Sequence, residues 1–552
     1  MKPAKISLLL ALTAFLLAAC RINHGLIDSS LPAGPGLTLD ESFNIGQGVY
    51  MFESFLEQGP FLFTPTGAEE VFGARGYLPD HPPLARFMLG AAHQLTSWAI
   101  PGAEDSMLNV PAARLGSCFF LALTVLLLTE FVRRRYGLPT AIWSAIALLL
   151  MPRVIGHARI AAQETTTTFF WLLAVVPLLS WWTEDEAPST KRSLIAGILF
   201  GLLLASKIQG VFLPPLVVAW SLYRFQWKAI RPLAIWGLTG FAVFFVLWPW
   251  LWLDPVKNLT QYIIKTSDRP ILYVWYLGQR YADKAVPFHY PFAILLATTP
   301  VAVMAALVTR LCKRAFDRIE WLALGTLFFP LFVFALPGTP VYDSVRLFLI
   351  VMPMLAFLAA RGLIQLTEWL PGKVTSHSTE TPPVSKVRRI LAAGLCAVMF
   401  FVTAARFNLH QPYCLEEYSL LVGGTKTAVD VLGLECSYWA EGMNGDFWNQ
   451  VPENSTVFVA PVSHQFQLQD LQQLVPVVQQ RNINLQSFLY EPTKQRGLLL
   501  LLHRLADLPP GLRKVPPAAK VIAEATYRGV VMARLVDTSE TDWAEFDGWP
   551  GE

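Results

Sequence analysis

Long apolar runs dominate the pattern of hydrophobic and polar positions along the chain. Runs of about 15 to 20 apolar residues approach the length that a helix needs to cross the hydrocarbon core of a bilayer. Eleven such runs occur, at residues 6–22, 113–132, 138–152, 165–182, 194–207, 209–223, 232–253, 290–310, 320–337, 346–361 and 389–406. The pattern predicts an all-α polytopic membrane protein with about eleven transmembrane helices.

The composition excludes an ordinary soluble protein. Hydrophobic residues make up 54% of the 552 residues and charged residues only 15%, against roughly 25% charged residues in a typical soluble domain. The 18 Trp and 36 Phe residues also fit a membrane protein, because aromatic side chains collect at membrane interfaces. The net charge of only +3 implies no polyanion-binding surface. Nucleic-acid binding, a secreted disulfide scaffold and a disordered chain are therefore set aside.

The basic residues predict which loops face the cytoplasm. With the N-terminus inside, the short cytoplasmic segments together carry 19 Lys and Arg residues, as the positive-inside rule requires. The outer regions are then loops 23–112 and 254–289 and the tail 407–552. We therefore expect a multi-pass protein of a bacterial inner membrane, with a transmembrane catalytic domain at 1–406 and an extracytoplasmic C-terminal domain at 407–552.

The tail is more polar than the rest and predicts a small α/β domain. Residues 456–460 and 529–536 have the β-branched and apolar character of strands, and 467–480 has the spacing of an amphipathic helix. Cys414 and Cys436 lie 22 positions apart in this tail. A disulfide between them and two unpaired thiols are left as alternatives.

Two interpretations of the N-terminus compete. The basic start, the apolar core and the sequence Leu-Ala-Ala before Cys20 are typical of a bacterial lipoprotein signal, which would be cleaved before Cys20. Alternatively, Cys20 ends an uncleaved first helix. We favour the uncleaved helix, because ten further spans anchor the chain without a lipid, and either interpretation leaves the first loop outside.

Ionisable groups gather at the predicted outer ends of the spans, and in a lipid setting such groups are functional candidates. The stretches that carry them are Asp40-Glu41, Asp80-His81-Pro-Pro, Arg153 to Arg159 and Glu164, Ser206-Lys207, Tyr276 to Tyr281 with Arg280, Pro287-Phe-His289-Tyr290, and Tyr342-Asp343-Ser-Val-Arg346. All of them are expected on one face of the membrane.

These motifs, in this order, resemble a known family. An acidic pair soon after the first span, the His-Pro-Pro-Leu of the first loop and an Arg-to-acid motif before a Thr- and Phe-rich span are similar to membrane glycosyltransferases of the GT-C fold. The resemblance is to family 39, which groups protein O-mannosyltransferase-like and aminoarabinose transferase-like enzymes. It extends over most of residues 1–440 and includes the stretch from Leu421 to Trp439. One departure is Glu164, where many relatives have Asp.

The resemblance implies transfer of a sugar from a polyprenyl-phosphate donor to a lipid, glycan or protein acceptor at the outer (periplasmic) face, with inversion. Such a transfer needs a base that takes the proton of the acceptor hydroxyl. Asp40 is the candidate base and Glu41 its alternate. Glu164 is a third catalytic candidate, with a role toward the acceptor or a metal. The other interpretations are that Asp40 caps the helix at 41–57 and that Glu164 pairs with Arg159.

The leaving group is a lipid phosphate, so cations should stabilise its developing charge. The candidates for substrate binding are Arg346, Lys207, Arg280, Arg159, His81, His289 and Tyr342. Simpler roles compete for several of them, since Arg346 could snorkel from its helix end, His81 could shape a rigid loop before two prolines, and His289 could pack at the interface.

No cofactor is assigned. A donor already linked to phosphate needs no nucleotide site, and no Walker or GxGxxG pattern is present. A divalent cation stays open, because the acids are too scattered to define a ligand set. Two other functions compete with the transferase: a transporter or lipid flippase, which usually has midplane charges or repeated halves, and a non-catalytic membrane anchor. The sequence shows neither of these transporter features, and an anchor would leave the loop carboxylates unexplained.

Overall fold

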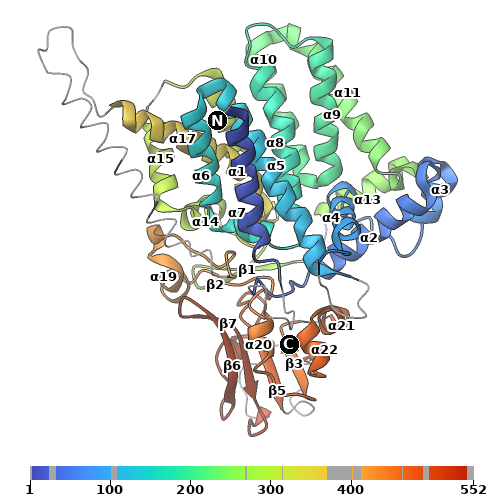
Figure 1. Cartoon of the computed structure of the whole chain (residues 1–552), viewed down its shortest axis with the longest axis vertical. Coiled ribbons are helices and arrows are strands. Elements are labelled where there is room, and N and C mark those ends of the chain that lie inside the picture. Colours follow the sequence, from blue (N-terminus) through green and yellow to red (C-terminus); the bar gives the residue numbers. More distant parts are fainter. Residues whose placement is uncertain are drawn as a thin grey trace, which may run out of the picture.

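The chain consists of a large helical part followed by a small mixed sheet (Figure 1). The computed structural model describes residues 3–23, 33–100, 108–267, 270–313, 315–369, 412–462, 464–488 and 497–543, together with the isolated positions 394 and 401. We refer to residues 3–369 as the helical body and to 412–543 as the sheet unit. The predicted boundary at 406 and, apart from those two positions, the predicted span 389–406 lie outside the described residues.

The first half of the helical body contains eleven labelled helices within its described residues. They are α1 (Pro3–Ala19), α2 (Glu41–Gln58), α3 (Pro65–Phe72), α4 (Leu84–Thr96), α5 (Val110–Tyr136), α6 (Leu138–Leu149), α7 (Pro152–Ala158), α8 (Gln163–Trp181), α9 (Thr190–Ser206), α10 (Leu213–Phe225) and α11 (Ile230–Leu247). Proline at the first or second position begins α3, α5, α6, α7 and α10, where its missing N–H costs nothing.

The second half begins with two short helices and a hairpin. These are α12 (Trp250–Leu253), α13 (Pro255–Ser267), β1 (Tyr273–Tyr276) and β2 (Gln279–Ala282), followed by α14 (Tyr290–Thr298), α15 (Val301–Cys312), α16 (Arg318–Ala335), the 3-10 turn η4 (Arg346–Val351) and α17 (Met352–Trp369). The hairpin turn uses Leu277 and Gly278, both with positive φ, which is the geometry of a two-residue turn that matches strand twist.

Four helices among the described residues are long and apolar enough to cross a membrane. They are Val110–Tyr136, Ile208–Leu247 taken across its short breaks, Arg318–Ala335 and Arg346–Leu366, and α6 with α7 adds a fifth if this pair, bent by 71°, is one span. The predicted membrane protein with several apolar helices is therefore confirmed. The predicted count of eleven spans stays a prediction.

Proline marks the places where predicted elements are broken. The predicted run 290–310 is divided at Pro300 into α14 and α15, and the predicted helix 467–480 is divided at Pro476. Proline has no N–H to donate and disfavours helical geometry in the residue before it. The apolar content of 290–310 and the amphipathic spacing of 467–480 each predicted helix correctly, but not its continuity.

The sheet unit is built on five strands in the order β4-β3-β5-β7-β6. They are β3 (Thr456–Ala460), β4 (Asn484–Ser487), β5 (Leu498–Leu502), β6 (Lys520–Tyr527) and β7 (Val530–Asp537). The short helices α19 (Gly424–Asp430) and α20 (Gly445–Trp448) precede the sheet. Helices α21 (Gln465–Leu474) and α22 (Pro476–Gln480) connect β3 to its parallel neighbour β4, while β7 runs antiparallel to β5 and β6. The predicted strands at 456–460 and 529–536 correspond to β3 and β7.

Both tail cysteines are free, buried thiols. Of the two alternatives left open by the sequence, the structure therefore has two unpaired thiols and no disulfide between them. Cys414 accepts a hydrogen bond from Arg159 Nη1 at 3.2 Å, and this contact joins the sheet unit to the loop between α7 and α8.

A fully buried ion pair fixes the loop that precedes α2. Arg114 on α5 donates from Nε and Nη2 to the two carboxylate oxygens of Glu41, at 2.7 and 2.6 Å, and neither side chain is exposed. The same guanidinium donates to the carbonyl oxygens of Ile22, Pro35 and Gly36. One buried cation therefore satisfies an acid and three loop carbonyls at once.

We expect Arg114→Met to destabilise the protein strongly, because it leaves the carboxylate of Glu41 buried without its partner. Breaking a buried ion pair in this way typically costs about 3–5 kcal/mol. The measurement is thermal unfolding of the purified protein in detergent. Arg133→Met is the matched control, because Arg133 pairs with Glu130 at a part-exposed site and its loss should shift the unfolding temperature little. Equal shifts for both variants would contradict the structural role of Arg114.

Candidate active site

A cavity of about 370 Å³ lies where the helical body meets the sheet unit. Its lining is mainly polar and aromatic and comes from both parts of the chain. The helical body contributes Leu39, Asp40, His81, Leu272, Tyr342, Asp343 and Arg346, and the sheet unit contributes Ser437, Tyr438, Trp439, Ala440, Pro461, Val462, His464, Gln467, Leu502, Arg504 and Asp507. Convergent polar groups in a concave site are typical of ligand binding.

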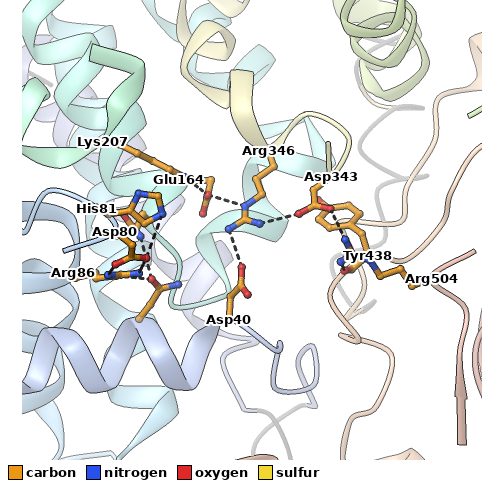
Figure 2. A network of polar contacts seen from close by, with 12 residues as sticks. Asp40, Asp80, His81, Arg86, Glu164, Lys207, Asp343, Arg346, Tyr438 and Arg504 are labelled. Carbon is orange, nitrogen blue, oxygen red and sulfur yellow. Dashed lines mark hydrogen bonds and ion pairs between the residues drawn. The ribbon is translucent and has the colours of Figure 1, made fainter. Parts of the chain in front are cut away.

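Arg346 is the centre of the charge network in this cavity (Figure 2). Its Nη2 donates to Asp40 Oδ2 at 2.9 Å, its Nε to Glu164 Oε1 at 2.9 Å and its Nη1 to Asp343 Oδ2 at 2.8 Å. The planar guanidinium can serve three carboxylates because its donors point in fixed, separate directions. Three segments far apart in the sequence are thereby held around one cation.

Lys207 adds a second cation to the same carboxylate. Its Nζ lies 2.5 Å from Glu164 Oε1, the oxygen that also accepts from Arg346, and the Lys207 and Glu164 side chains are 5% and 2% exposed. Lys207 directly follows the C-terminal end of α9, and Glu164 lies in the first turn of α8. Glu164 Oε2 has no hydrogen-bond partner among the described residues. Two cations therefore converge on one oxygen of a buried acid.

Asp40 faces the cavity instead of capping its helix. It occupies the N-cap position of α2 but makes no side-chain cap hydrogen bond. Its carboxylate is 38% exposed and is held by Arg346. This placement favours the predicted role as a base over the alternative role as a helix cap, since a base must be able to reach a substrate hydroxyl.

Asp343 is a site residue that lies in one of the predicted motifs but was not among the predicted catalytic or binding residues. It is buried, and both Asp343 and Ser344 have positive φ, at 54° and 56°. Such backbone conformations are costly for non-glycine residues and cluster at functional sites. Burial raises the pKa of the Asp343 carboxyl above its ordinary value, although Arg504 and Arg346 oppose this. The signal in the sequence was its position three residues before Arg346.

The sheet unit supplies further residues that sequence reasoning did not place at the site. Arg504 Nη2 lies 3.4 Å from Asp343 Oδ1, and Arg504 also contacts the carbonyl oxygen of Tyr438 and the carboxylate of Asp507. The ring of Trp439 lies 4.2 Å from the guanidinium carbon of Arg346. No pattern local to 502–507 predicts this, because β5 brings these residues to the cavity only once the sheet is formed.

His81 lies at the edge of the same network. It lines the cavity, and its Nε2 is 3.9 Å from Asp80 Oδ2. Asp80 is itself bound by both terminal nitrogens of Arg86, at 2.5 and 2.9 Å. Arg86 also donates to Asn44 on α2. The Asp80–Arg86 pair therefore fixes the loop that carries His81 against the helix that carries Asp40.

Six predicted site residues lie outside the cavity lining: Glu164 and Lys207, which belong to the charge network of Arg346, and four others that take no part in it. Glu41 is held by Arg114 and also accepts hydrogen bonds from the backbone N–H groups of Thr38 and Ala161. Arg159 donates to Cys414 and to the Leu17 carbonyl oxygen, Arg280 donates to the Ala506 carbonyl oxygen and stacks on Tyr273, and His289 shares a hydrogen bond with Tyr276. Glu164 is paired with Lys207 and Arg346 instead of Arg159. Proton transfer by Glu41 would require its buried ion pair to break, so we assign it a structural role.

No group of three or more His, Cys, Asp or Glu residues within the described ranges has the arrangement of a metal site. The residues around Arg346 alternate in charge, and each acid there is already bound to a cation.

Comparison with known proteins agrees with the resemblance seen in the sequence. Residues 80–252 match the family model described as dolichyl-phosphate-mannose-protein mannosyltransferase. This stretch contains His81, Glu164 and Lys207. The predicted resemblance to family 39 is confirmed over these residues, which are similar to that family of mannosyltransferases. The match does not favour the transporter or the anchor.

Solved structures with a similar arrangement include ArnT from Cupriavidus metallidurans in its apo state, with 14% identity, a TM-score of 0.48, and coverage of 97% of this chain and 98% of that chain. The same protein bound to undecaprenyl phosphate gives 14% identity, a TM-score of 0.49, and coverage of 96% and 97%. The Pmt1-Pmt2 complex of S. cerevisiae gives 18% identity, a TM-score of 0.34, and coverage of 50% and 38%. With TM-scores below 0.5, these likenesses carry no argument about this chain. No curated protein sequence matches it.

Glu435 gives the site region a pH-dependent stability that can be measured. Burial raises the pKa of its carboxyl to about 8, against the opposing field of Arg504, and its Oε1 accepts from the Ala506 backbone N–H at 3.0 Å. An acid with a raised pKa binds its proton more tightly in the folded chain than in the unfolded chain. Its contribution is therefore full at low pH and is lost as the pH rises through about 8.

We expect the unfolding temperature of the native protein, relative to Glu435→Gln, to fall between pH 5 and pH 9. The Gln side chain still offers an oxygen to the Ala506 N–H but does not titrate. The comparison therefore isolates the effect of protonation from the effect of losing this hydrogen bond. Thermal unfolding in detergent across this pH range gives the difference directly. A difference that stays constant with pH would contradict the raised pKa.

Proposed function

We propose that this protein is an inverting glycosyltransferase that moves a sugar from a polyprenyl-phosphate donor to an acceptor hydroxyl in the cavity around Arg346. The observation that carries the proposal is that Arg346, in the cavity lining, binds Asp40 and shares a Glu164 oxygen with Lys207, which lies behind the lining. Two cations suit a phosphate leaving group, and an exposed carboxylate suits the removal of a hydroxyl proton.

The cations act on the leaving phosphate. Arg346 and Lys207 share the single oxygen Glu164 Oε1, so the negative charge of Glu164 is divided between two positive groups. A phosphate entering the cavity can accept from the guanidinium and the ammonium, and its interaction strengthens as negative charge develops on it. Preorganised donors of this kind stabilise the transition state without reorganisation.

Asp40 acts as the base. A phosphate bound to Arg346 competes for the guanidinium nitrogen that holds Asp40, and this frees the carboxylate. Asp40 then takes the hydroxyl proton as the acceptor oxygen attacks the anomeric carbon. The bond from that carbon to the phosphate oxygen breaks, and its electron pair leaves with the polyprenyl phosphate. Attack opposite the leaving group inverts the anomeric centre.

The same proposal assigns roles to the parts of the chain. The transmembrane region 1–406 binds the donor and carries the base and the cations, and 407–552 lies at the outer face of a bacterial inner membrane. The positive-inside pattern supports this orientation. The acceptor is a lipid, a glycan or a protein segment that reaches the cavity from the outer side.

The first test is donor turnover. We expect purified protein in liposomes, offered a panel of polyprenyl-phosphate sugars with lipid, glycan and peptide acceptors, to release free polyprenyl phosphate from one of them, as measured by mass spectrometry. Asp40→Asn should lower turnover by about 10²–10⁴-fold, the range typical for loss of a general base. Asp430→Asn, at an exposed position paired with Lys426, is the matched control and should turn over normally.

Undiminished turnover by Asp40→Asn would keep the reaction and move the base, with Asp343→Asn as the next variant. Absence of turnover with every donor and acceptor, in native protein shown to be folded by cooperative thermal unfolding, would contradict the proposed function.

The phosphate role of Arg346 is tested by Arg346→Lys. The charge is kept, but a single ammonium cannot serve Asp40, Glu164 and Asp343 with fixed geometry. We expect kcat to fall by about a hundredfold, the scale on which a misplaced group costs rate. Arg280→Lys is the control, since Arg280 lies outside the cavity lining and contacts the Ala506 carbonyl oxygen. Similar losses in both variants would contradict the assignment.

A further inference from the structure

One short stretch of the sheet unit contacts both of the groups that the proposed reaction needs. Residues 436–444, called here the strap, run along the cavity and include Ser437, Tyr438, Trp439 and Ala440 of its lining. The strap belongs to the part of the chain beyond the transmembrane helices, yet it lies against Arg346 and against the loop before Asp40.

The side chain of Trp439 lies on Arg346. The centre of its ring is 4.2 Å from the guanidinium carbon, and the residue is only 2% exposed. His157 packs edge-to-face against the same ring, with 5.6 Å between ring centres. A buried aromatic face attracts a guanidinium through its quadrupole, and the attraction is strongest where water is excluded. The ring therefore favours one orientation of the guanidinium plane.

The main chain of the strap holds the loop that carries Asp40. The carbonyl oxygen of Trp439 accepts from the N–H of Leu39 at 3.3 Å, and the carbonyl oxygen of Glu441 accepts from the N–H of Gly36 at 2.8 Å. Gly36 packs so closely that a Cβ there would lie 2.4 Å from the Met443 carbonyl oxygen. The residue next to Asp40 is thus bound directly to Trp439.

Glu441 fixes the strap itself. Its Oε2 accepts from the backbone N–H of Trp439 at 3.0 Å, and its side chain is fully buried. The indole, the carbonyl oxygen that holds Leu39 and the acid that holds the strap therefore form one unit. A shift of this unit would move the guanidinium of Arg346 and the carboxylate of Asp40 relative to each other.

We infer that Trp439 is a positioning residue for the transfer reaction, which sets the orientation of Arg346 and, through the strap, the place of Asp40. This inference rests on the proposed function. It makes the sheet unit a part of the catalytic machinery, so that the chemical step depends on its docking. Errors of about 1 Å in the placement of reacting groups can cost about a hundredfold in rate.

The test compares Trp439→Phe and Trp439→Ala with Trp448→Ala in the full-length protein in liposomes. Trp448 is a fully buried Trp of the sheet unit, and its indole donates to the carbonyl oxygen of Met443 in the strap. Truncation of Trp448 therefore reports general loosening of the sheet unit and the strap, with the ring of Trp439 still in place. We expect Trp439→Ala to lower kcat by about tenfold or more with little change in KM for the acceptor. Trp439→Phe keeps a ring face for the guanidinium and should retain most of the rate.

A double-mutant cycle with Arg346→Lys separates positioning from bulk structure. If Trp439 acts through Arg346, removal of the ring in the Arg346→Lys background should cost less than about twofold, because coupled residues are not additive. A raised acceptor KM at unchanged kcat, full additivity in the cycle, or equal losses in Trp439→Ala and Trp448→Ala would each overturn the inference.

Turnover by the native protein separates the proposed function from the positioning role of Trp439. Turnover by the native chain with no effect of Trp439→Ala would leave the proposed function standing and overturn only the positioning role. A folded native chain that turns over none of the donors would overturn the proposed function, and the role of Trp439 would fall with it.

Discussion

The site depends on a single constraint: one largely buried guanidinium has to satisfy three carboxylates from three distant segments. Arg346 binds Asp40 at the start of α2, Glu164 at the start of α8 and Asp343 in its own loop. A charge removed from water is tolerated only when it is paired and hydrogen-bonded. Each of the three segments must therefore reach the cavity for the others to be stable there.

The supporting pairs follow from this constraint. Glu164 is paired with Lys207 as well as with Arg346, and Asp343 is paired with Arg504 as well as with Arg346. Arg114 and Glu41 satisfy each other at full burial, while the adjacent Asp40 faces the cavity. Adjacent acids in the sequence are thereby given different tasks by their surroundings, one structural and one exposed to substrate.

The junction between the helical body and the sheet unit is more than a boundary between two parts. The cavity is lined from both sides, and the hairpin β1–β2 meets the sheet unit where the N–H of Gly278 donates to the Gly433 carbonyl oxygen at 2.9 Å. Figure 1 shows this hairpin between the helices and the sheet. A site that needs both parts can be complete only when they are docked, which couples folding of the sheet unit to the chemistry.

The sequence by itself determined the membrane class, the position of most helices, the strands at 456–460 and 529–536, and the family resemblance, because hydrophobic periodicity and short motifs are local properties. It also pointed to Glu164, Lys207 and Arg346, since each lies at an end of an apolar run, and to Asp40 in the first outer loop. Only the tertiary structure decided that Arg346 joins the other three, that Glu41 is withdrawn into a pair with Arg114, and that Arg159, Arg280 and His289 lie elsewhere. It also brought Asp343, Trp439 and Arg504 to the cavity. Most of those outcomes depend on contacts between segments far apart in the sequence, where charge pairing and exclusion of water act on groups that no local pattern connects.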